Sequence, residues 1–326
     1  MSPDLRACLR AVDGLKLWSR APLAPFTTIG VGGPADLLAA AATPEAVAAA
    51  LACLADSERP WTFLGAGSNL LVADGGYRGV VLKLGDEMQF VDTPGAAGDT
   101  PDVEPESSPA KGDNEVVLEV GAATPLPRLA ALVADWGLSG LEFACAIPGS
   151  VGGAVFMNAG AHGGEMSTVV DAVQLAFADG VRWLSAASLS WAYRSCSLPE
   201  GCAVTGVRVR LTRGEPQAVK AMQRRYLQWR RENQPRGVRT FGSTFRNPPG
   251  DSAGRLLDMA GMKGMCRGGA EVSRIHANFL INSGDATADE IAALMTMMRE
   301  AVYVKADVLL EPEVRVLGMK LPWEHA

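Results

Sequence analysis

The sequence predicts an α+β protein built from more than one domain. Its 326 residues are 48% hydrophobic, which is enough apolar material for two or three separate cores. Short apolar runs of strand length alternate along the chain with longer runs in which apolar residues recur every three to four positions, as in helices. No repeat of fixed period is visible, so a solenoid or another array is not expected.

Composition and charge exclude several classes of protein. The net charge of −6 is mild and argues against a nucleic acid or an acidic membrane as the main partner. Charged residues interrupt the amino terminus, where a signal peptide would need an apolar run. The most apolar segment, 37–55, is broken by Thr43-Pro44-Glu45, so no membrane span is expected.

The cysteines and histidines argue against a metal site. None of the six cysteines has C-x-x-C spacing, and the chain has only three histidines. We expect free thiols, a reducing cytoplasmic location and no bound metal. The cysteines are Cys8, Cys53, Cys145, Cys196, Cys202 and Cys266, and the histidines are His162, His276 and His325.

The first expected unit is small, spans about 27–85 and mixes strands with one helix. Thr43 precedes an alanine-rich run with Pro44 at its first position and Glu45 in its first turn, a pattern that predicts the start of a helix. Strands are predicted at 36–42, 61–65 and 80–84, where the apolar runs are short.

The loop GAGSNL follows the strand at 61–65 and is a candidate binding loop. It lacks the third glycine of a dinucleotide fingerprint, and no helix is predicted after it, so a Rossmann fold is not favoured. We expect the loop to offer backbone N–H groups and two polar side chains to a pyrophosphate. A plain connection between strands remains the alternative. The loop consists of Gly65, Ala66, Gly67, Ser68, Asn69 and Leu70.

The second expected unit, 86–214, consists mainly of strands. Residues 93–115 are rich in Pro, Gly, Ser and acidic side chains, which cannot bury a core, so they should form a mobile surface insertion. Strands are predicted at 116–120, 169–176, 181–184 and 203–211, and a helix at 125–136.

Within this unit, residues 140–165 are too glycine-rich for a core and too apolar for a disordered segment, which indicates a cofactor cradle. Glycines let the backbone turn through positive φ and bring N–H groups close to a bulky anion. Pro148 fixes the entry, and Ser150 and Asn158 add polar contacts. A tight turn in an apolar region is the alternative. The glycines are Gly149, Gly152, Gly153, Gly160, Gly163 and Gly164.

The third expected unit, 215–320, begins with a basic helix at 216–233 that ends before Pro235. A short helix at 252–260 and single strands at 271–281 and 308–318 are also predicted. Thr287 and Glu290 form a capping box that opens another helix. The basic helix carries an apolar stripe of Val219, Met222, Tyr226 and Trp229, and the later helix turns Ile291, Leu294, Met295, Met298 and Val302 inward.

Seven short stretches of the chain, taken in order, carry a resemblance to a known family. They are TTIGVGGPAD (27–36), LGAGSNLLV (64–72), IPGSVGGAVFMNAGAHGGE (147–165), YRSC (193–196), GSTFRNP (242–248), KGMCRGGAEVSRIHANF (263–279) and LEPEV (310–314). Over nearly its whole length the chain resembles the UDP-N-acetylenolpyruvoylglucosamine reductases, also called UDP-N-acetylmuramate dehydrogenases. The resemblance implies a two-part FAD-binding lobe of the vanillyl-alcohol-oxidase (PCMH) type, 20–85 and 86–214, and a separate α+β substrate-binding lobe, 215–320. The basic helix resembles that of the shorter subtype.

The resemblance also implies an activity and its cofactors. Such an enzyme uses NADPH to reduce the enolpyruvyl group of UDP-N-acetylglucosamine enolpyruvate to UDP-N-acetylmuramate in peptidoglycan precursor synthesis. It implies noncovalent FAD, NADPH as co-substrate, no nucleic-acid or membrane partner, and a monomer. The implied FAD-binding residues are Gly65, Ala66, Gly67, Ser68, Asn69, Leu70, Pro148, Gly149, Ser150, Gly152, Gly153, Asn158 and Ala161.

Three residues are implied as catalytic. Arg194 would hold the substrate carboxylate, because a guanidinium is permanently charged and binds carboxylates through two nitrogens. Ser243 would donate a proton to the carbon next to that carboxylate, and Glu313 would stabilise the enol as a neutral acid. From the residues alone, a surface arginine, a turn serine and a strand-face ion pair between Glu313 and Arg315 remain alternatives.

Tyr193, Asn247 and Lys263 are implied as substrate-binding residues. His162 is expected to carry no covalent flavin, and His276 to be a packed polar residue rather than a base. An FAD-dependent oxidase of the same superfamily is the main competing function, and a flavin-carrying protein without turnover is another. The stretches GSTFRNP and LEPEV favour the reductase, because they belong to its substrate lobe.

Overall fold

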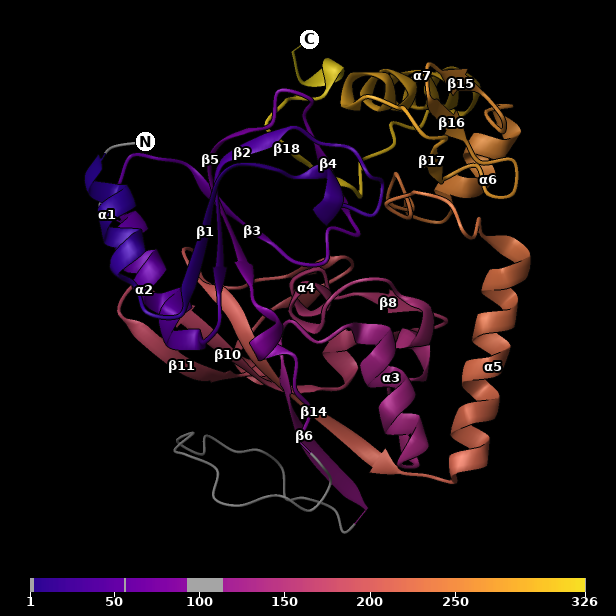
Figure 1. The fold of residues 1–326 in the computed structure, drawn as a ribbon. Coiled ribbons are helices and arrows are strands. Elements are labelled where there is room, and N and C mark those ends of the chain that lie inside the picture. The colour runs from indigo at the N-terminus through magenta and orange to yellow at the C-terminus, as the bar shows by residue number, and fades with distance from the viewer. Residues whose placement is uncertain (1–2, 56, 93–113, 326) are drawn as a thin grey trace. The chain divides into compact units, whose positions relative to one another are not determined.

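The computed structural model describes residues 3–55, 57–92 and 114–325 (Figure 1). The chain forms two units. The first consists of Met1–Leu17, Ala39–Gly65 and Val81–Gln228, and the second of Trp18–Leu38, Ala66–Val80 and Trp229–Ala326. Most of the insertion predicted at 93–115 lies outside the described residues. The domain boundaries expected from the sequence remain predictions.

A four-stranded sheet with the order β1-β2-β5-β3 forms from the N-terminal part of the chain. Its strands are β1 (Leu15–Pro22), β2 (Pro34–Ala41), β3 (Trp61–Leu64) and β5 (Tyr77–Leu84). The three predicted strands are confirmed, whereas β1 was not predicted because its polar residues hide the apolar pattern. Helix α2 (Pro44–Ala55) starts as predicted, because the Thr43 hydroxyl accepts a hydrogen bond from the Ala46 N–H at 3.1 Å.

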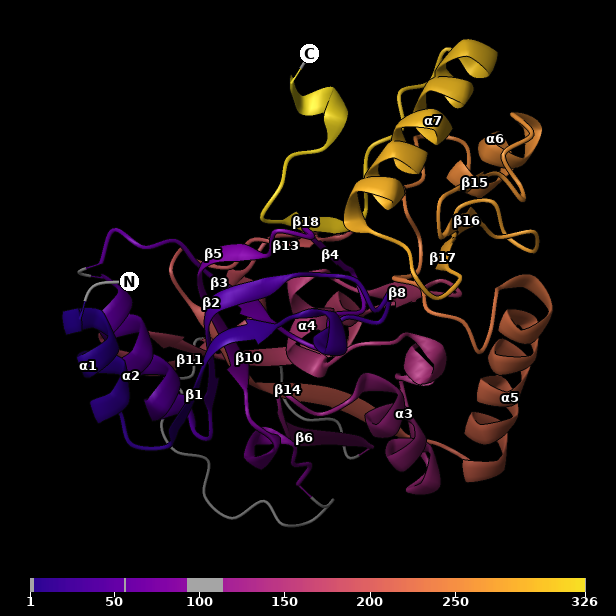
Figure 2. The same ribbon diagram turned by 45° about the horizontal axis from the view of Figure 1, so that its top comes forward.

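A disulfide joins the two N-terminal helices. Helix α1 (Pro3–Ala11) lies beside α2 in both views (Figures 1 and 2), and Cys8 of α1 is bonded to Cys53 of α2. The expectation that all six cysteines are free is therefore wrong for this pair. The spacing of cysteines along a chain cannot show which two helices pack side by side. Cys145, Cys196, Cys202 and Cys266 are free thiols.

The first unit contains an antiparallel sheet with the order β11-β10-β14-β6. Glu115 begins β6 and pairs with Thr212. The predicted insertion, 93–115, therefore extends into a strand at its C-terminal end. An acidic residue can join this ladder because Arg210 forms an ion pair with its carboxylate at 2.9 Å. The predicted strands are confirmed as β6 (Glu115–Gly121), β10 (Val170–Phe177), β11 (Gly180–Ser185) and β14 (Ala203–Arg213), and β7 (Leu138–Ser139) pairs with β14.

Shorter elements of the first unit surround its core. Helix α4 (Val151–Phe156) packs on β6 and β14, and α3 (Leu126–Asp135) buries Leu126, Leu129 and Val133 in the same core. Two tight hairpins form at β8 (Gly160–Ala161) with β9 (Gly164–Glu165) and at β12 (Trp191–Ala192) with β13 (Ser195–Cys196).

Helix α5 (Pro216–Asn233) has the predicted bounds, but only part of the predicted apolar stripe is buried, since Tyr226 is partly covered by His162. Val219 and Gln223 are its buried residues, whereas Met222 and Trp229 are 42% and 46% exposed. A polar contact helps to hold this face, since the Gln223 side chain donates to the Ala130 carbonyl at 2.7 Å. Periodicity alone could not reveal a docking face centred on a glutamine.

The second unit has shorter strands than the sequence suggested. The stretch 271–281 is not one strand: β16 (Ala270–Val272) and β17 (Leu280–Asn282) are antiparallel, with β15 (Cys266–Arg267) beside β16. The chain turns between them because the Ser273 hydroxyl accepts the N–H groups of Ile275 and His276. The strand predicted at 308–318 is reduced to β18 (Arg315–Leu317), which runs parallel to β4 (Leu70–Val72).

Two helices complete the second unit. Helix α6 (Ala253–Met259) is capped by Ser252. Helix α7 (Ala288–Ala306) starts with the predicted capping box of Thr287 and Glu290, and its five predicted inward residues are all buried. Among the described residues, no helix is long and apolar enough to cross a membrane.

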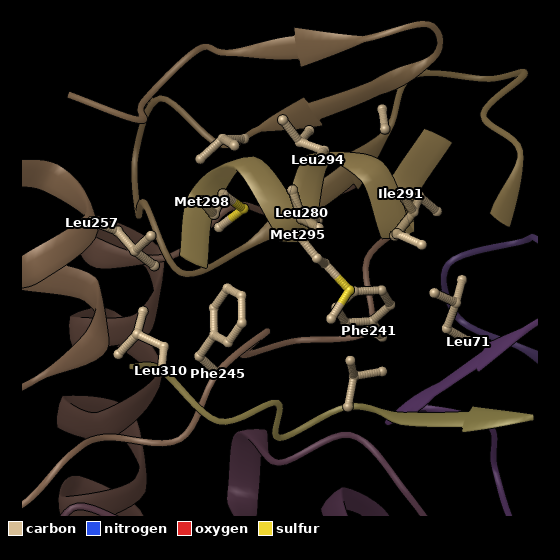
Figure 3. Packing of buried hydrophobic residues seen from close by; sticks show 14 of the residues in the cluster. Leu71, Phe241, Phe245, Leu257, Leu280, Ile291, Leu294, Met295, Met298 and Leu310 are labelled. Carbon is tan, nitrogen blue, oxygen red and sulfur yellow. The ribbon is translucent and has the colours of Figure 1, made fainter. Parts of the chain in front are cut away.

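Figure 3 shows the core under α7. Phe241 and Phe245 point from the chain after α5 toward Met295 and Met298, and Leu310 lies beside Phe245. Both phenylalanines are almost fully buried. Phe241 directly precedes the GSTFRNP stretch, which begins at Gly242, and Phe245 lies in its middle, so the two rings flank the predicted catalytic serine and this core fixes where it lies.

The disulfide leads to a stability prediction. Replacing Cys8 and Cys53 by serine should lower the free energy of unfolding by about 4 kcal/mol, because the bond closes a loop of 45 residues in the unfolded chain. Urea unfolding with and without dithiothreitol measures the effect. The control is Cys266→Ser, which changes an exposed free thiol and should stay within about 0.5 kcal/mol of the wild type. Equal stability of the wild-type protein in both conditions would contradict the prediction.

Candidate flavin and substrate sites

The glycine-rich stretch of the first unit leads into α4. Ser150 caps this helix, and its hydroxyl accepts the Gly153 N–H at 3.3 Å. Gly65, from the other predicted binding loop, lies against the same serine, since a Cβ added there would come within 3.1 Å of the Ser150 hydroxyl oxygen. The structure thus brings the start of the GAGSNL loop and the cradle together at Ser150.

Several backbone amides of the cradle already have protein partners. The N–H groups of Val151 and Gly152 donate to the Thr124 and Ala122 carbonyls, each at 2.9 Å, and that of Gly153 donates to Ser150. Beyond α4, Phe156 is 40% exposed. This part of the cradle therefore offers an apolar surface rather than a row of free amides.

Asn158 is fully buried and connects the cradle to the β12–β13 hairpin. Its side-chain oxygen accepts the Ser167 N–H at 2.9 Å, and its amide nitrogen donates to the Ala192 carbonyl at 3.1 Å. Its φ of 39° lies in the left-handed region, which asparagine tolerates better than most residues. The residue predicted as a cofactor contact thus also fixes the hairpin that carries Tyr193 and Arg194.

Tyr193 and Arg194 form the tip of that hairpin. The Arg194 guanidinium carbon lies 4.8 Å from the centre of the Tyr193 ring, a cation–π contact. Arg194 has a φ of 58°, and Tyr193 is 48% exposed. Burial raises the pKa of the nearby Cys196 thiol to about 11, so this thiol stays protonated at neutral pH.

In the second unit, the rest of the GAGSNL loop is held by main-chain contacts. Gly67 has a φ of 63° and accepts the Thr28 N–H at 3.1 Å, and any side chain on it would overlap the Phe26 carbonyl. The Asn69 side chain donates to the Glu313 carbonyl at 3.1 Å, and the Arg315 N–H donates to the Asn69 carbonyl at 3.1 Å. Asn69 therefore positions the segment that contains Glu313.

The predicted catalytic residues Ser243 and Glu313 lie on adjacent segments of the second unit. The Glu313 N–H donates to the Thr244 carbonyl at 2.8 Å, and Phe245 meets Pro312 in an isolated bridge. Ser243 and Glu313 are both partly buried. Arg194 belongs to the first unit, so the structure brings two of the three predicted catalytic residues together within one unit.

Asn278 was missed by the sequence analysis. It is buried, and its side chain accepts the Phe245 N–H at 2.9 Å and donates to the Phe245 carbonyl at 2.8 Å. Its own carbonyl accepts the Thr244 N–H at 2.8 Å. The available signal was an asparagine between apolar residues in the stretch that resembles the family, because a buried amide must find partners for its donor and its acceptor.

The predicted substrate-binding residues have protein partners in this structure. The Asn247 side-chain oxygen accepts the Ala253 N–H at the start of α6 at 3.0 Å, and Lys263 forms an ion pair with Asp258 at 2.7 Å. Both residues are exposed. Lys263 could exchange Asp258 for a ligand oxygen without breaking a core contact, and the Asn247 amide nitrogen could donate to a ligand while its oxygen keeps the Ala253 N–H.

His162 and His276 have different environments. His162 stacks on Tyr226 of α5, with ring centres 4.1 Å apart. His276 is partly buried, and its Nδ1 accepts the Asn278 N–H at 3.2 Å. Burial and the Lys263 ammonium lower the pKa of His276 below its usual value, so its ring is neutral at pH 7. Among the described residues, His, Cys, Asp and Glu form no cluster able to hold a metal ion.

The role of Asn158 can be tested by mutation. Asn158→Ala should destabilise the protein by about 2–4 kcal/mol, because it removes both hydrogen bonds of a fully buried side chain, leaves a small cavity and leaves a partly buried N–H and C=O without these partners. Urea unfolding monitors the change. The control Asn233→Ala removes a single hydrogen bond, to the Trp229 carbonyl, at the exposed end of α5, and should cost less than about 1 kcal/mol. A loss no larger than in this control would show that the two hydrogen bonds do not fix the hairpin.

Comparison with known proteins identifies the family. Residues 35–185 match the model of an FAD binding domain, and residues 234–317 match that of the UDP-N-acetylenolpyruvoylglucosamine reductase C-terminal domain. The UDP-N-acetylenolpyruvoylglucosamine reductase of Anaeromyxobacter dehalogenans (strain 2CP-C) is 45% identical over 94% of this chain and 87% of its own length. That of Myxococcus xanthus (strain DK1622) is 40% identical over 96% of each chain.

A solved structure supports the same assignment. The crystal structure of UDP-N-acetylenolpyruvylglucosamine reductase from Thermus caldophilus covers 93% of this chain and 98% of its own, with a TM-score of 0.75 at 35% identity. The predicted fold class, an FAD-binding lobe with a separate substrate-binding lobe, is confirmed. The chain belongs to the UDP-N-acetylenolpyruvoylglucosamine reductase family, the flavoenzymes of peptidoglycan precursor synthesis.

Proposed function

We propose that this protein reduces UDP-N-acetylglucosamine enolpyruvate to UDP-N-acetylmuramate, with the proton and the enol controlled by Ser243 and Glu313. The observation that carries this proposal is the backbone hydrogen bond of 2.8 Å between Glu313 and Thr244. It holds the serine and the glutamate on neighbouring segments of one unit. The proposed reaction needs both groups close to the same part of the substrate.

FAD fits the residues of the first unit. At Gly65 a side chain would crowd the buried Ser150 hydroxyl, so the glycine lets the two loops approach closely, and Phe156 provides an exposed apolar surface. We assign the FAD-binding residues as predicted, with Gly65, Ser150 and Asn158 supported by these contacts. Bound FAD supplies hydride transfer from NADPH to the substrate.

Arg194 is assigned to the substrate carboxylate. Hydride addition to the terminal carbon of the enolpyruvyl group leaves negative charge on the carboxylate side, and a permanently charged guanidinium stabilises that charge. The Tyr193 ring, 4.8 Å from the guanidinium carbon, restricts the arginine without neutralising it. Tyr193 is exposed enough to contact the nucleotide sugar as well.

Ser243 is assigned as the proton donor to the carbon beside the carboxylate. A serine hydroxyl is a weak acid in water, but the carbanion that forms is far more basic, and a closed site excludes competing water. Glu313 is assigned to the enol oxygen. Asn69 acts as a positioning residue, because its hydrogen bond to the Glu313 carbonyl fixes that segment.

Asn247 and Lys263 are assigned to oxygens of the substrate. The ion pair of Lys263 with Asp258 is exposed, so its exchange for a phosphate or carboxylate costs little. The matched C-terminal domain belongs to the reductases and therefore favours this activity over an oxidase of the same superfamily.

We further propose that the protein is a cytoplasmic monomer of the shorter subtype. NADPH and nucleotide sugars are metabolites of the cytoplasm, and no partner surface is needed for the assigned chemistry. In a reducing compartment the Cys8–Cys53 bond would persist only if its reduction potential were low.

A direct assay tests the proposed function. Purified, flavin-loaded protein is mixed with NADPH and UDP-N-acetylglucosamine enolpyruvate, and UDP-N-acetylmuramate is measured by mass spectrometry. The flavin should be released by acid precipitation, because no covalent bond to His162 is expected. Oxidation of NADPH that depends on oxygen rather than on the enolpyruvyl substrate would instead identify an oxidase.

Ser243→Ala separates proton donation from binding. The variant should accept hydride from NADPH almost normally, because that half-reaction needs no proton at the substrate carbon. Reoxidation by the enolpyruvyl substrate should slow by about 10²–10⁴-fold, the usual effect of losing a positioned acid. Stopped-flow absorbance at the flavin band follows both halves. Ser283→Ala, which changes an exposed serine of the same unit, is the control. Equal slowing of both halves would overturn the assignment of Ser243.

A further inference from the structure

A tight turn from His276 to Phe279 carries Asn278, the residue that holds the segment after the predicted proton donor. The Phe279 N–H donates to the His276 carbonyl at 3.0 Å and closes the turn. Inside the turn, the Asn278 N–H donates to Nδ1 of the His276 ring at 3.2 Å. The imidazole thus takes the role that an Asp or Asn side chain has when it accepts a backbone N–H two residues further on.

Asn278 passes the geometry of this turn on to the segment of Ser243. Its side chain binds the N–H and the carbonyl of Phe245, and its own carbonyl accepts the Thr244 N–H at 2.8 Å. Ser243 meets Phe279 in an isolated bridge. Asn278 is only 3% exposed, so water cannot readily replace these hydrogen bonds. A shift of the turn therefore moves the main chain next to the serine.

The His276 ring is held in place from several sides. The Ser273 hydroxyl accepts the His276 N–H at 3.3 Å, and Ser273 is buried. The ring meets Phe279 edge-on, with ring centres 4.9 Å apart. A Cβ added at Gly254 of α6 would come within 2.6 Å of the ring, so only a glycine leaves room for it there. These contacts keep Nδ1 directed at the Asn278 N–H.

Only the neutral imidazole can accept this hydrogen bond. A backbone N–H is always a donor, so Nδ1 must be unprotonated and the ring proton lies on Nε2. A second proton would place an N–H on Nδ1, facing the Asn278 N–H, and two donors repel each other. In the described part of the chain, the charged side chains that act on the ring are Lys263 and Asp258. Burial and the Lys263 ammonium lower the pKa of His276, and the Asp258 carboxylate opposes them.

We propose that His276 is a positioning residue for proton transfer from Ser243, and that it acts only as the neutral ring. This inference rests on the proposed function, in which Ser243 protonates the substrate carbon. Loss of the acceptor at Nδ1 frees Asn278 and with it the main chain beside the serine. A misplacement of about 1 Å can slow a reaction on the order of 10²-fold. Reoxidation of the flavin by the enolpyruvyl substrate should therefore depend on His276, whereas its reduction by NADPH should not.

Two substitutions separate the acceptor from its protonation. His276→Asn places an amide oxygen close to the position of Nδ1 and cannot titrate, whereas His276→Phe keeps a ring without an acceptor. The flavin is reduced by light and EDTA, and its reoxidation by the enolpyruvyl substrate is followed by stopped flow between about pH 5 and about pH 8, the range in which histidine changes its charge.

The three proteins should give different pH profiles. In the wild type the rate should fall as the pH falls through the pKa of His276, which lies below its ordinary value of 6.5. His276→Asn should keep the rate at neutral pH and lose this fall. His276→Phe should be slower on the order of 10- to 100-fold throughout the range, and NADPH should still reduce its flavin at the wild-type rate.

Hydrogen–deuterium exchange provides a measurement that does not need turnover. It reports the N–H groups of Thr244 and Phe245, which Asn278 binds. Their exchange should be faster in His276→Phe and unchanged in His276→Asn. The control is Tyr303→Leu, which removes an exposed ring from the same unit and should match the wild type in both measurements.

The results distinguish this proposal from the proposed function. An unchanged reoxidation rate in His276→Phe overturns the positioning role, whether or not the exchange is faster. So does equal slowing of flavin reduction and reoxidation together with a lower melting temperature, since that pattern indicates a general structural role. If the wild type forms no UDP-N-acetylmuramate but exchange responds as expected, the proposed function is wrong and the link from His276 to the Ser243 segment stands.

Discussion

The hydrogen bond from the Glu313 N–H to the Thr244 carbonyl is the contact on which the second unit depends. It joins two segments that are far apart in the sequence and that carry the predicted proton donor and the predicted acid. Asn69 holds one of these segments through the Glu313 carbonyl, and Asn278 holds the other through Phe245. The apolar core under α7 keeps Phe245 in place, so the packing of this core determines where the reactive side chains lie (Figure 3).

Buried asparagines take the place of strand pairing at both candidate sites. Long strands would use every backbone N–H and C=O in a ladder and leave no irregular segment to carry a functional side chain. Asn158 in the first unit and Asn278 in the second satisfy the backbone groups of loops that no strand covers. An amide side chain suits this task because it offers a donor and an acceptor at once. The loops therefore stay ordered, while the side chains at their tips remain available to a ligand.

The polar side chains of the two sites differ in how firmly they are held by protein partners. Lys263 has an exposed and easily exchanged partner in Asp258, whereas the Asn247 oxygen is held by the N–H of the buried Ala253. A site that must bind a highly charged nucleotide and then release its product gains from weakly held partners.

Local signals in the sequence determined the helix starts, most of the longer strands and the family. Thr43 and the capping box of Thr287 and Glu290 marked helix starts correctly, because a cap involves residues only a few positions apart. The order of the glycine-rich and GSTFRNP stretches was enough to indicate the family and its fold. Tertiary structure alone decided the environment of single side chains. Examples are the Cys8–Cys53 disulfide, the two hydrogen bonds of Asn158 and the buried Arg246 Nε without a hydrogen-bond partner. These features depend on which distant segments meet in space, and no spacing along one chain records that.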